Sequence, residues 1–404
     1  MAKRILIYTN HYFPEQFKIN DVVNWLNEEN YDIRVVTGFP NYPSGKIYKG
    51  YGLFSKISSK VTDTLIINRL PLIPRGSGSN LMLAINYFSY FISSMLFTFY
   101  LIMFKKKYEV VLVHHTSPFL VSIPPIFYKL FKSSKNILWD LDIWPQTLVA
   151  MGIIKNKKII NLIDYTVKLI YKSYDKILVS SKSLKEYLIS RTTENKIDFF
   201  PNWADEGIEL SDLDEVEQML DSNYLNIMYI GNIGKAQDFG SLIKGLEILN
   251  NEKLRFYFIG GGRFKRRFQS IIKSKRFSSK IIFIDHQKIN KISSYAKQAD
   301  VLFLSLKNEK IFNKTLPAKL TMYMSIGKPI LAMISGEANN LINKSKIGIA
   351  VDSGDYTNLA NKILDLINDK YNIVEMGHNA KKLYESEFNS GLRKKQIIKL
   401  IELI

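Results

Sequence analysis

Two carboxylates at alternate positions are the first residues whose types and spacing suggest chemistry. Asp140 and Asp142 lie in the stretch WDLDIWPQT, which covers residues 139–147. A hard cation such as Mg²⁺ takes oxygen ligands, and it often combines one or two carboxylates with the phosphate oxygens of a substrate. The spacing is therefore compatible with a metal site, and the alternative is a structural role for these side chains.

Two junctions between a predicted strand and a predicted helix are rich in glycine. Gly231 and Gly234 bracket the turn in MYIGNIGKAQDF, and Gly261 is the middle glycine of FIGGGRFKRRF. Glycine allows backbone N–H groups and the positive end of a helix to approach a phosphate. We expect the first turn, which also contains Asn232 and Lys235, to bind a phosphate. For the second turn a purely structural role is as plausible.

A third stretch, NKTLPAKLTMYMSIGKPILA, combines a helix start with a cation. Pro317 suits the first turn of a helix, which leaves unpaired backbone N–H groups near Thr315 and Ala318. Lys319 follows directly, and Lys314 is a second cation close by. This helix start is a reasonable seat for a pyrophosphate, and the alternative is that Lys319 is an ordinary solvated helix lysine.

The chain is strongly basic and contains no cysteine. Its 56 lysines and arginines against 37 acidic residues give a net charge of +19, which would attract nucleic acid, an anionic membrane face or a phosphorylated substrate. No zinc-finger spacing, RNP-type aromatic motif or basic zipper accompanies this charge, so nucleic acid is the weaker alternative. The densest basic stretch, residues 263–280, is compatible with a solvated helix face. The lack of cysteine excludes disulfides and thiolate metal sites, and it favours a reducing cytoplasm.

The elements that must position these residues follow an alternating pattern. Short β-branched runs alternate with helix-length segments along the chain, and the alternation breaks only at residues 201–215, PNWADEGIELSDLDE. This pattern predicts an α/β fold of two doubly wound, Rossmann-like domains. Ligands in such sheets bind outside the carboxyl ends of the strands, so we expect the site in a cleft between the domains. The predicted strands are residues 4–9, 32–38, 64–70, 109–115, 136–142, 176–181, 197–201, 225–234, 254–262, 280–285, 299–306, 328–333 and 347–351.

One apolar segment is long enough to cross a membrane. Residues 81–104 carry no charged side chain, and Lys105, Lys106 and Lys107 follow them. The segment meets the length criterion for a span, but it falls where a crossover helix between two strands of the first sheet belongs. We favour a buried or membrane-surface helix, and a true span is the alternative.

Several stretches together resemble, in order, the family 4 retaining glycosyltransferases with the two-domain GT-B fold. The similarity runs from about Arg4 to Ala380, and it is closest to the branch with the bacterial N-acetyl-L-fucosaminyl transferases of O-antigen and capsule assembly. The stretches are YTNHYFPEQFKINDVVNWL, TGFPNYPSGKIYKGYG, DIWPQTLVAMGI, FPNWAD, YIGNIGKAQDF, TLPAKLTMYMSIGKPILA and GEANNLI with IGIAV.

The resemblance implies a domain plan and a reaction. Residues 1–205 are expected to form an acceptor-binding domain, residues 206–380 a nucleotide-sugar-binding domain, and residues 381–404 a helix that packs back toward the first domain. The implied reaction moves N-acetyl-L-fucosamine or a related N-acetyl amino sugar from a UDP-sugar to a polyprenyl-diphosphate-linked saccharide. The resemblance also implies no cofactor and no metal. Because the chain is basic and its apolar segment lies beside Arg69, Arg75 and Lys105 to Lys107, the enzyme is expected to be peripheral on the anionic inner face of the cell membrane.

The resemblance also assigns roles to residues. It implies that Asp140 is structural and that Asp142 orders a loop or faces the acceptor. His114 and His115 are expected near the donor sugar, although a histidine satisfied near a strand end is as plausible. The expected catalytic residues are Lys319, His114, His115, Asp142 and Glu337; the expected donor-binding residues are Gly231, Asn232, Gly234, Lys235, Gly261, Ile284, Lys314, Thr315, Pro317 and Ala318; the expected acceptor-binding residues are His11, Glu15, Lys18, Asn41 and Tyr42.

The sequence departs from the family at its usual phosphate clamp. Two family glutamates align with Lys314 and Met322, and the family's arginine and lysine after the first glycine turn align with Asn232 and Gln237. We therefore expect Lys319 to serve as a point charge on the phosphate, helped by Lys235 or Lys314. A GT-B-like UDP-sugar epimerase is a further alternative, but it would need carboxylates in the cleft for acid and base work.

Overall fold

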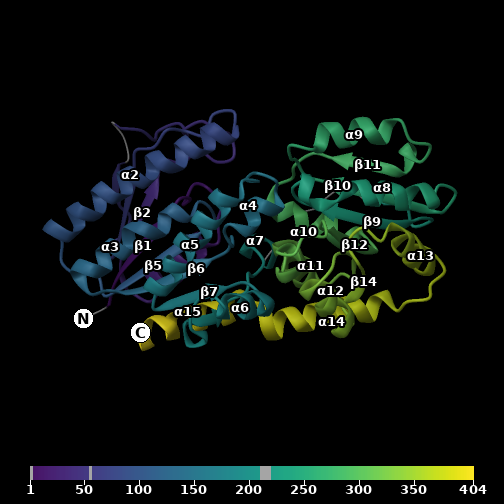
Figure 1. Ribbon diagram of the computed structural model, residues 1–404. Coiled ribbons are helices and arrows are strands. Elements are labelled where there is room, and N and C mark those ends of the chain that lie inside the picture. Colours follow the sequence, from purple (N-terminus) through teal and green to yellow (C-terminus); the bar gives the residue numbers. More distant parts are fainter. Residues whose placement is uncertain (1–2, 54–56, 210–219) are drawn as a thin grey trace. The chain divides into compact units, whose positions relative to one another are not determined.

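The computed structural model describes residues 3–53, 57–209 and 220–404, which form two units (Figure 1). The first unit contains Met1–Phe200 and Lys394–Ile404, and the second contains Pro201–Arg393. The chain thus leaves the first unit before the predicted boundary at residue 205 and re-enters it after residue 380. Part of the predicted linker, residues 210–219, lies outside the described residues.

The first unit is built on an eight-stranded sheet with the order β3-β4-β2-β1-β5-β6-β7-β8. Every pairing is parallel except that of β3 with β4. Ile7 pairs with Val35 on one side and with Leu112 on the other, so apolar strands lie at the centre, where a parallel sheet is covered on both faces. The strands are β1 (Arg4–Thr9), β2 (Asp32–Gly38), β3 (Ser58–Lys60), β4 (Leu65–Leu70), β5 (Val110–His115), β6 (Lys135–Asp140), β7 (Lys176–Val179) and β8 (Ile197–Phe199).

Helices connect the parallel strands of the first unit. Helix α1 links β1 to β2, α2 links β4 to β5, and α3 links β5 to β6 after a short 3₁₀ turn, η1 (Phe119–Ser122). These are the crossover connections that parallel strands require. The helices are α1 (Ile19–Glu28), α2 (Asn80–Phe104), α3 (Ile123–Lys132), α4 (Gln146–Ala150), α5 (Lys157–Ser173) and α6 (Lys182–Ile189), and the 3₁₀ turn η2 covers Glu194–Lys196.

The polar side chains of α2 point inward. Tyr90 Oη lies 2.9 Å from the carbonyl oxygen of Thr9 and 3.1 Å from that of Val36, and it donates to them. The hydroxyls of Tyr8 and Thr98 are hydrogen-bonded at 2.6 Å. These bonds hold α2 on the strands, so the helix is an integral part of the first unit. The buried residues of α2 are Asn86, Tyr90, Ser94, Thr98 and Leu101.

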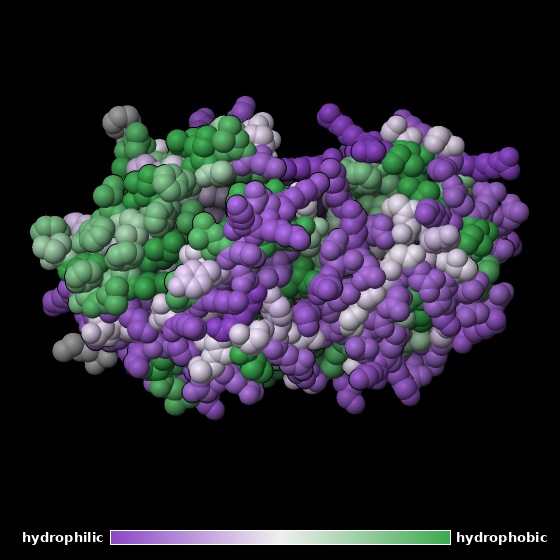
Figure 2. All heavy atoms as spheres, viewed as in Figure 1, coloured by the Kyte–Doolittle hydropathy of each residue, from purple (hydrophilic) through white to green (hydrophobic). Residues whose placement is uncertain are grey.

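The opposite side of α2 is apolar and exposed. Leu81, Leu96 and Phe104 are 70%, 66% and 71% exposed, and Leu130 and Phe131 of α3 are also exposed. Figure 2 shows apolar side chains gathered over α2 and α3. Within the described residues α2 alone is long and apolar enough to cross a membrane, by length and composition only. An apolar face turned away from its own sheet is what a helix lying on a lipid surface requires.

The second unit contains a six-stranded parallel sheet with the order β11-β10-β9-β12-β13-β14. Its core is rich in packed phenylalanine rings; those of Phe239 and Phe268 stack at 4.8 Å, and Phe258 meets both. The carboxyl ends of β9 and β10 lie side by side, because Ile230 pairs with Ile259. The strands are β9 (Leu225–Ile230), β10 (Leu254–Ile259), β11 (Ile281–Ile284), β12 (Val301–Ser305), β13 (Ile330–Met333) and β14 (Gly348–Val351).

Helices α7 to α14 belong to the second unit, and most of α15 belongs to the first. Lys3 Nζ donates to the carbonyl oxygens of Ile401 at 2.8 Å and Glu402 at 3.0 Å, and Lys394 Nζ lies 2.8 Å from Glu28 Oε2. The helices are α7 (Glu206–Glu209), α8 (Phe239–Ile248), α9 (Lys265–Lys273), α10 (Ile289–Gln298), α11 (Ala318–Ile326), α12 (Glu337–Lys344), α13 (Tyr356–Ile367), α14 (Ile373–Leu383) and α15 (Ser390–Leu403), and the shorter turns are η3 (Lys235–Gln237), η4 (Ser278–Lys280), η5 (Phe312–Lys314) and the π-turn η6 (Tyr384–Phe388).

Candidate functional site

The two glycine turns of the second unit pack backbone against backbone. Gly231 follows β9 and Gly260 follows β10, with φ values of +128° and +138°. A β-carbon on residue 260 would lie 2.2 Å from the carbonyl oxygen of Gly231, and one on residue 262 would lie 2.3 Å from that of Ile233. Only glycine fits such contacts. The turns therefore form one joined surface at the carboxyl ends of β9 and β10, where ligands bind in sheets of this kind.

Most backbone N–H groups of the first turn are already used. The amide of Gly231 donates to Ile259 O at 2.9 Å, that of Ile233 donates to Gly261 O at 2.7 Å, and that of Gly234 donates to Gln237 Oε1 at 2.9 Å. The expectation that the amides of residues 231–234 cradle a phosphate is therefore wrong for these three. The glycines instead give close packing, and Asn232 occupies the exposed tip of the turn.

Helix α11 places Lys319 beside the first glycine turn. The hydroxyl of Tyr323 accepts a bond from Ile230 N and donates one to Phe303 O, each at 3.0 Å. Residues four apart share a helix face, so Lys319 lies one turn earlier on the same side. A β-carbon on Gly231 would be 2.6 Å from Lys319 Cε. The tether at Tyr323 thus fixes the lysine against the end of β9.

The Lys319 ammonium is desolvated and has no anionic partner. Its Nζ lies 5.0 Å from the centre of the Tyr229 ring, and burial lowers the pKa of Lys319 to about 8. Among the described residues, no carboxylate oxygen lies within the 4.0 Å of an ion pair from this nitrogen. Burying an unpaired charge is costly, so the site is electrostatically incomplete and suits an anionic ligand.

The start of α11 adds backbone donors next to this ammonium. Pro317 is the N-cap residue, and the amides of Ala318 and Lys319 in the first turn have no protein acceptor in the described part of the chain. The prediction that the amide of Thr315 is open to a phosphate is wrong, because this N–H donates to Phe312 O at 3.1 Å. Pro317 has no N–H to donate. The helix dipole and two open amides favour an anion here.

The remaining residues predicted to bind the donor differ in exposure and in their contacts. Lys235 is exposed, whereas Lys314, Ile284 and Glu337 are partly buried. Ile284 ends β11, and its carbonyl oxygen accepts a bond from Gly260 N at 3.3 Å. Glu337 begins α12, directly after a glycine whose β-carbon would lie 1.9 Å from the carbonyl oxygen of residue 313. That contact brings the start of α12 next to the segment containing Lys314.

In the first unit, His11 and Glu15 form a buried polar pair. His11 Nδ1 lies 2.5 Å from Glu15 Oε2, and Glu15 Oε1 accepts bonds from the amides of Asn41 and Tyr42, both at 2.6 Å. Burial, together with the nearby guanidinium of Arg75, lowers the pKa of His11. The structure thus brings together four of the five residues predicted for the acceptor. The fifth, Lys18, precedes α1, and its Nζ lies 3.8 Å from Asp21.

Arg75 was not predicted as a site residue, and it completes this cluster. Its Nη2 lies 2.8 Å from His11 Nε2. Because a guanidinium can only donate, Nε2 accepts, and the His11 proton sits on Nδ1 and faces Glu15. The guanidinium carbon lies 5.2 Å and 5.5 Å from the ring centres of Tyr42 and Tyr87. Apart from being a cation in the loop after β4, Arg75 shows no local sequence signal of this role.

His114 and His115 are both buried, and their ring partners differ. Thr9 Oγ1 donates to the carbonyl oxygen of His11 at 2.8 Å, so the contact of 3.0 Å with His114 Nδ1 has the histidine as donor. Burial lowers the pKa of His114 to about 3, which keeps the ring neutral. His114 Nε2 has no hydrogen-bond partner within the described residues, so it is an acceptor open to a ligand hydroxyl if the ring becomes accessible.

The two aspartates have separate partners. Asp140 is fully buried; Oδ1 contacts His115 Nδ1 at 2.7 Å and Oδ2 accepts from Tyr171 Oη at 2.6 Å. Asp142 accepts from Ser117 Oγ, which also accepts from the indole N–H of Trp144 at 2.9 Å. His115 Nδ1 is therefore occupied by Asp140 inside the unit and does not face an open surface. Over the described ranges, no three His, Asp or Glu residues form a group that could hold a metal.

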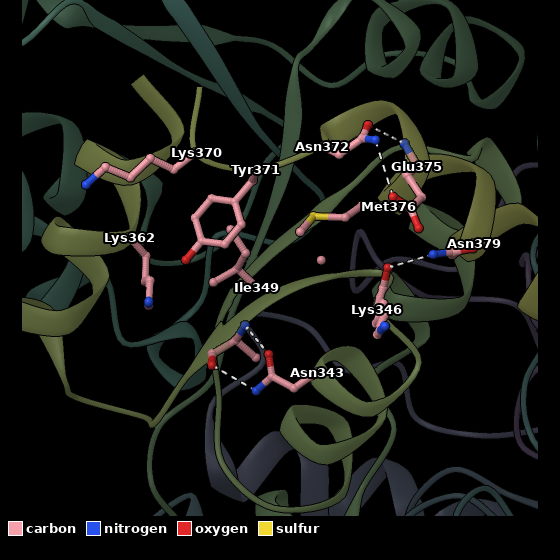
Figure 3. Close-up of a pocket in the computed structure, with 12 residues that line it drawn as sticks. Asn343, Lys346, Ile349, Lys362, Lys370, Tyr371, Asn372, Glu375, Met376 and Asn379 are labelled. Atoms are coloured by element: carbon pink, nitrogen blue, oxygen red, sulfur yellow. Dashed lines mark hydrogen bonds between the residues drawn. The ribbon is translucent and has the colours of Figure 1, made fainter. Parts of the chain in front are cut away.

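A separate pocket of about 550 Å³ lies in the second unit, between α12, β14, α13 and α14 (Figure 3). Several of its polar groups already have partners in the protein. The side chain of Asn343 donates to and accepts from Ala350, and Asn379 donates to Lys346 O at 3.3 Å. Lys370 pairs with Asp365 at 2.9 Å. Because these groups are satisfied, the pocket offers no chemistry comparable to that around Lys319.

Comparison with known proteins finds similarity to glycosyltransferases. Residues 212–383 match the family model described as "Glycosyl transferases group 1". The chain is 24% identical over 351 residues to the "Putative colanic acid biosynthesis glycosyl transferase WcaI" of Escherichia coli strain K12, over 83% of this chain and 84% of that protein.

Solved structures resemble the chain over its whole length. Sucrose-phosphate synthase from Thermosynechococcus elongatus has a TM-score of 0.75 at 13% identity, over 100% of this chain and 99% of that one. Anabaena HepE in complex with UDP has a TM-score of 0.67 at 11% identity, over 100% of both chains. At these identities the likeness shows the fold, and it confirms the predicted pair of Rossmann-like units.

Proposed function

We propose that this protein, a glycosyltransferase of group 1 with the GT-B fold, transfers a sugar from a UDP-sugar to a lipid-linked saccharide. The proposed sugar is N-acetyl-L-fucosamine or a related N-acetyl amino sugar, and the proposed acceptor is a polyprenyl-diphosphate-linked saccharide of capsule or O-antigen assembly. The name of the E. coli relative refers to colanic acid biosynthesis, and HepE was solved with UDP. The E. coli name supports a role in polysaccharide assembly, and the UDP complex of HepE supports UDP as the leaving group.

The observation that carries this proposal is the unpaired ammonium of Lys319. It lies against Gly231 and beside two open amides at the start of α11, and no described carboxylate neutralises it. A diphosphate supplies the missing negative charge. A lysine ammonium is a known point-charge partner for phosphate, and a helix start is a favourable place for a phosphate.

This arrangement stabilises the charge that develops during transfer. The hydroxyl oxygen of the acceptor forms a bond to the anomeric carbon while the bond from that carbon to the β-phosphate oxygen breaks, and the hydroxyl proton passes to the departing diphosphate. Negative charge develops on the diphosphate during this step. The ammonium of Lys319 and the amides of Ala318 and Lys319 are positioned in advance to stabilise that charge. We propose that this lysine supplies the positive charge needed and that no cofactor takes part.

The first unit supports an acceptor role because His11, Glu15 and His114 are neutral or internally paired. His11 keeps its proton on Nδ1 toward Glu15, and the low pKa of His114 makes it a poor base at neutral pH. Such groups hydrogen-bond a sugar hydroxyl without removing its proton. The departing diphosphate is then the better proton acceptor, which agrees with the mechanism above.

Direct turnover tests this function. The purified full-length protein is incubated with UDP-N-acetyl sugars and a synthetic polyprenyl-diphosphate-linked N-acetylhexosamine, and the products are followed by UDP release and mass spectrometry. We expect one donor to give UDP together with an acceptor heavier by one sugar residue. No product with any UDP-sugar, combined with no binding of UDP by calorimetry, would show that the proposal is wrong.

We also propose that the enzyme is peripheral on the inner face of the cell membrane. The exposed apolar face of α2 is followed by Lys105, Lys106 and Lys107, and cations beside an inserted apolar face favour anionic lipids. Flotation with liposomes tests this. We expect the protein to float with anionic vesicles and not with neutral ones, and indifference to both would contradict the proposal.

A further inference from the structure

The first unit contains an apolar groove of about 610 Å³ beside the acceptor cluster. It lies between α2, the loop before α2, η1 and the loop after β6. Its polar lining groups are satisfied within the protein: Ser89 Oγ accepts from Ile73 N at 2.9 Å and donates to Asn86 O at 2.8 Å, and the indole N–H of Trp144 bonds to Ser117. The groove lining consists of Ile73, Ala84, Ile85, Tyr87, Phe88, Ser89, Ile92, Pro118, Leu120 and Trp144.

A cation without a carboxylate partner stands at the edge of this groove. Tyr87 lines the groove, and its ring lies 5.5 Å from the guanidinium carbon of Arg75. Arg75 Nη2 bonds to a neutral His11, and Arg75 Nε is buried with no hydrogen-bond partner in the part of the chain that is described. No ion pair of Arg75 occurs there either. A guanidinium has five donors in a fork that fits a phosphate.

We infer that the groove holds the isoprenoid chain of the lipid-linked acceptor and that Arg75 binds its diphosphate. This inference rests on the proposed function, and it adds the groove and Arg75 to the acceptor site. A hydrocarbon chain needs no hydrogen bonds, which matches a lining whose polar atoms are already used. An anionic head next to the chain matches the unpaired guanidinium.

The surroundings favour a lipid over a protein partner. Phe88 and Ile92 line the groove and are also exposed on α2, so the groove is continuous with the apolar face that includes Leu81 and Leu96. A long polyprenyl chain can enter the groove while its remainder stays in the bilayer. Trp144, two residues after Asp142, also lines the groove. Arg75 contacts both Tyr87 of the groove and His11, which places the diphosphate end of the acceptor near the acceptor cluster.

Binding measurements on the full-length protein in mild detergent test the inference. Farnesyl diphosphate, farnesol and inorganic pyrophosphate are titrated by calorimetry, with UDP as an independent ligand of the second unit. For the wild type we expect farnesyl diphosphate to bind at least about tenfold more tightly than either of its parts, a difference of about 1.4 kcal/mol. Equal affinities for farnesyl diphosphate and farnesol would overturn the role of Arg75.

Two matched variants separate the groove from the rest of α2. Ala84→Trp fills the groove, and Leu96→Trp places the same side chain on the exposed face of the same helix outside it. We expect Ala84→Trp to weaken farnesyl diphosphate about tenfold and to leave pyrophosphate and UDP unchanged, whereas Leu96→Trp behaves as the wild type. Equal effects of the two variants would overturn the groove as the binding place.

Arg75→Gln tests the head group. We expect this variant to bind farnesyl diphosphate no better than farnesol while UDP affinity is retained. If farnesyl diphosphate fails to bind the wild type and Ala84→Trp instead converts a dimer to a monomer in sedimentation, the groove is an interface between copies and the inference is wrong. If the wild type does not bind UDP, the proposed function is contradicted. The UDP titration is a separate measurement from the lipid titrations, so the two failures can be distinguished.

Discussion

The polar clusters at the strand ends of the two units differ in whether their charged groups have protein partners. In the first unit, Glu15 faces His11 and Asp140 faces His115 and Tyr171, so each carboxylate is matched by protein donors. In the second unit, Lys319 is partly buried beside Gly231 with no described anion. The carboxylates of the first cluster are paired without a ligand, whereas the ammonium of the second is not. We therefore propose that the first cluster hydrogen-bonds sugar hydroxyls of the acceptor, next to the acceptor diphosphate at Arg75, and that the second binds the diphosphate of the donor.

Removing the unpaired cation gives the largest expected effect. Lys319→Ala is expected to lower kcat/KM by roughly 10²- to 10³-fold, which is the usual cost of losing one preoriented group that stabilises transition-state charge. Stability is expected to be unchanged or slightly higher, because the variant removes a desolvated charge that forms no ion pair with a described residue. Steady-state kinetics and thermal melting measure the two effects.

The matched control is Lys297→Ala, which removes an exposed lysine from α10. We expect wild-type kinetics and melting for this variant. Normal activity of Lys319→Ala, or an equal loss in both variants, would contradict the contrast between the two clusters.

Breaking the first cluster is expected to affect stability instead. Glu15 accepts three hydrogen bonds, from His11, Asn41 and Tyr42. Glu15→Gln turns an amide N–H₂ toward one of these buried donors, and an unsatisfied buried donor costs about 1–3 kcal/mol. Urea denaturation is expected to show this loss, with UDP affinity unchanged.

Glu247→Gln is the control for Glu15→Gln, because Glu247 is a partly exposed carboxylate paired with Lys275 at 2.6 Å. Exposed ion pairs contribute about 0–1 kcal/mol. If the Glu15 variant lost no more stability than this one, the first cluster would not be the tightly paired structure described above.

The affinity for UDP is expected to depend on pH through Lys319. Burial lowers the pKa of Lys319 in the free protein to about 8, and a bound diphosphate raises it by favouring the charged form. Affinity is therefore constant below about pH 8 and falls by up to about tenfold per pH unit above it, as the free protein loses the ammonium proton. Calorimetry with UDP from pH 7 to 10 measures the slope.

Lys319→Arg gives the comparison for this pH dependence. A guanidinium stays charged over this range, so the slope is expected to disappear even if the absolute affinity is lower. An unchanged slope in Lys319→Arg would show that another group titrates.

The smallest expected effect comes from moving Lys319 without removing it. A β-carbon in Gly231→Ala would lie 2.6 Å from Lys319 Cε. Alanine is also strained at the φ of +128°, which is expected to lower stability, so UDP affinity is measured on the folded protein. The flexible lysine side chain is expected to shift to an unfavourable rotamer. That costs about 0.5–1.5 kcal/mol, or roughly two- to tenfold in UDP affinity. In Gly261→Ala the added carbon meets no atom within 4 Å, so we expect no change. Equal UDP affinities of the two variants would mean that Lys319 is not held at Gly231.

Most of the fold could be predicted from the sequence because its strands are strong apolar runs. All predicted strands occur, with ends shifted by a few residues. β3 was missed because its three residues, Ser58–Lys60, are polar and pair antiparallel at the sheet edge. The inward polar face of α2 could have been predicted from the sequence, because polar residues recur at every fourth position: Asn86, Tyr90, Ser94 and Thr98.

The candidate site was only partly predictable. A lysine two residues after a proline at a helix start pointed to Lys319, but nothing local showed that Tyr323 would tether the helix to Ile230. The occupied amides of the first glycine turn depend on the neighbouring strand β10, which is distant in sequence. Arg75 was not predicted as a site residue, because its contact with His11 depends on how the loop after β4 meets the loop after β1.

A comparison of UDP with uridine tests the central claim most directly. Calorimetry on the wild type and on Lys319→Ala gives the contribution of the diphosphate in each. We predict that the wild type prefers UDP to uridine strongly and that the variant reduces this preference at least about tenfold, with uridine affinity unchanged. An equal preference in the two proteins would contradict the claim that Lys319 holds the diphosphate.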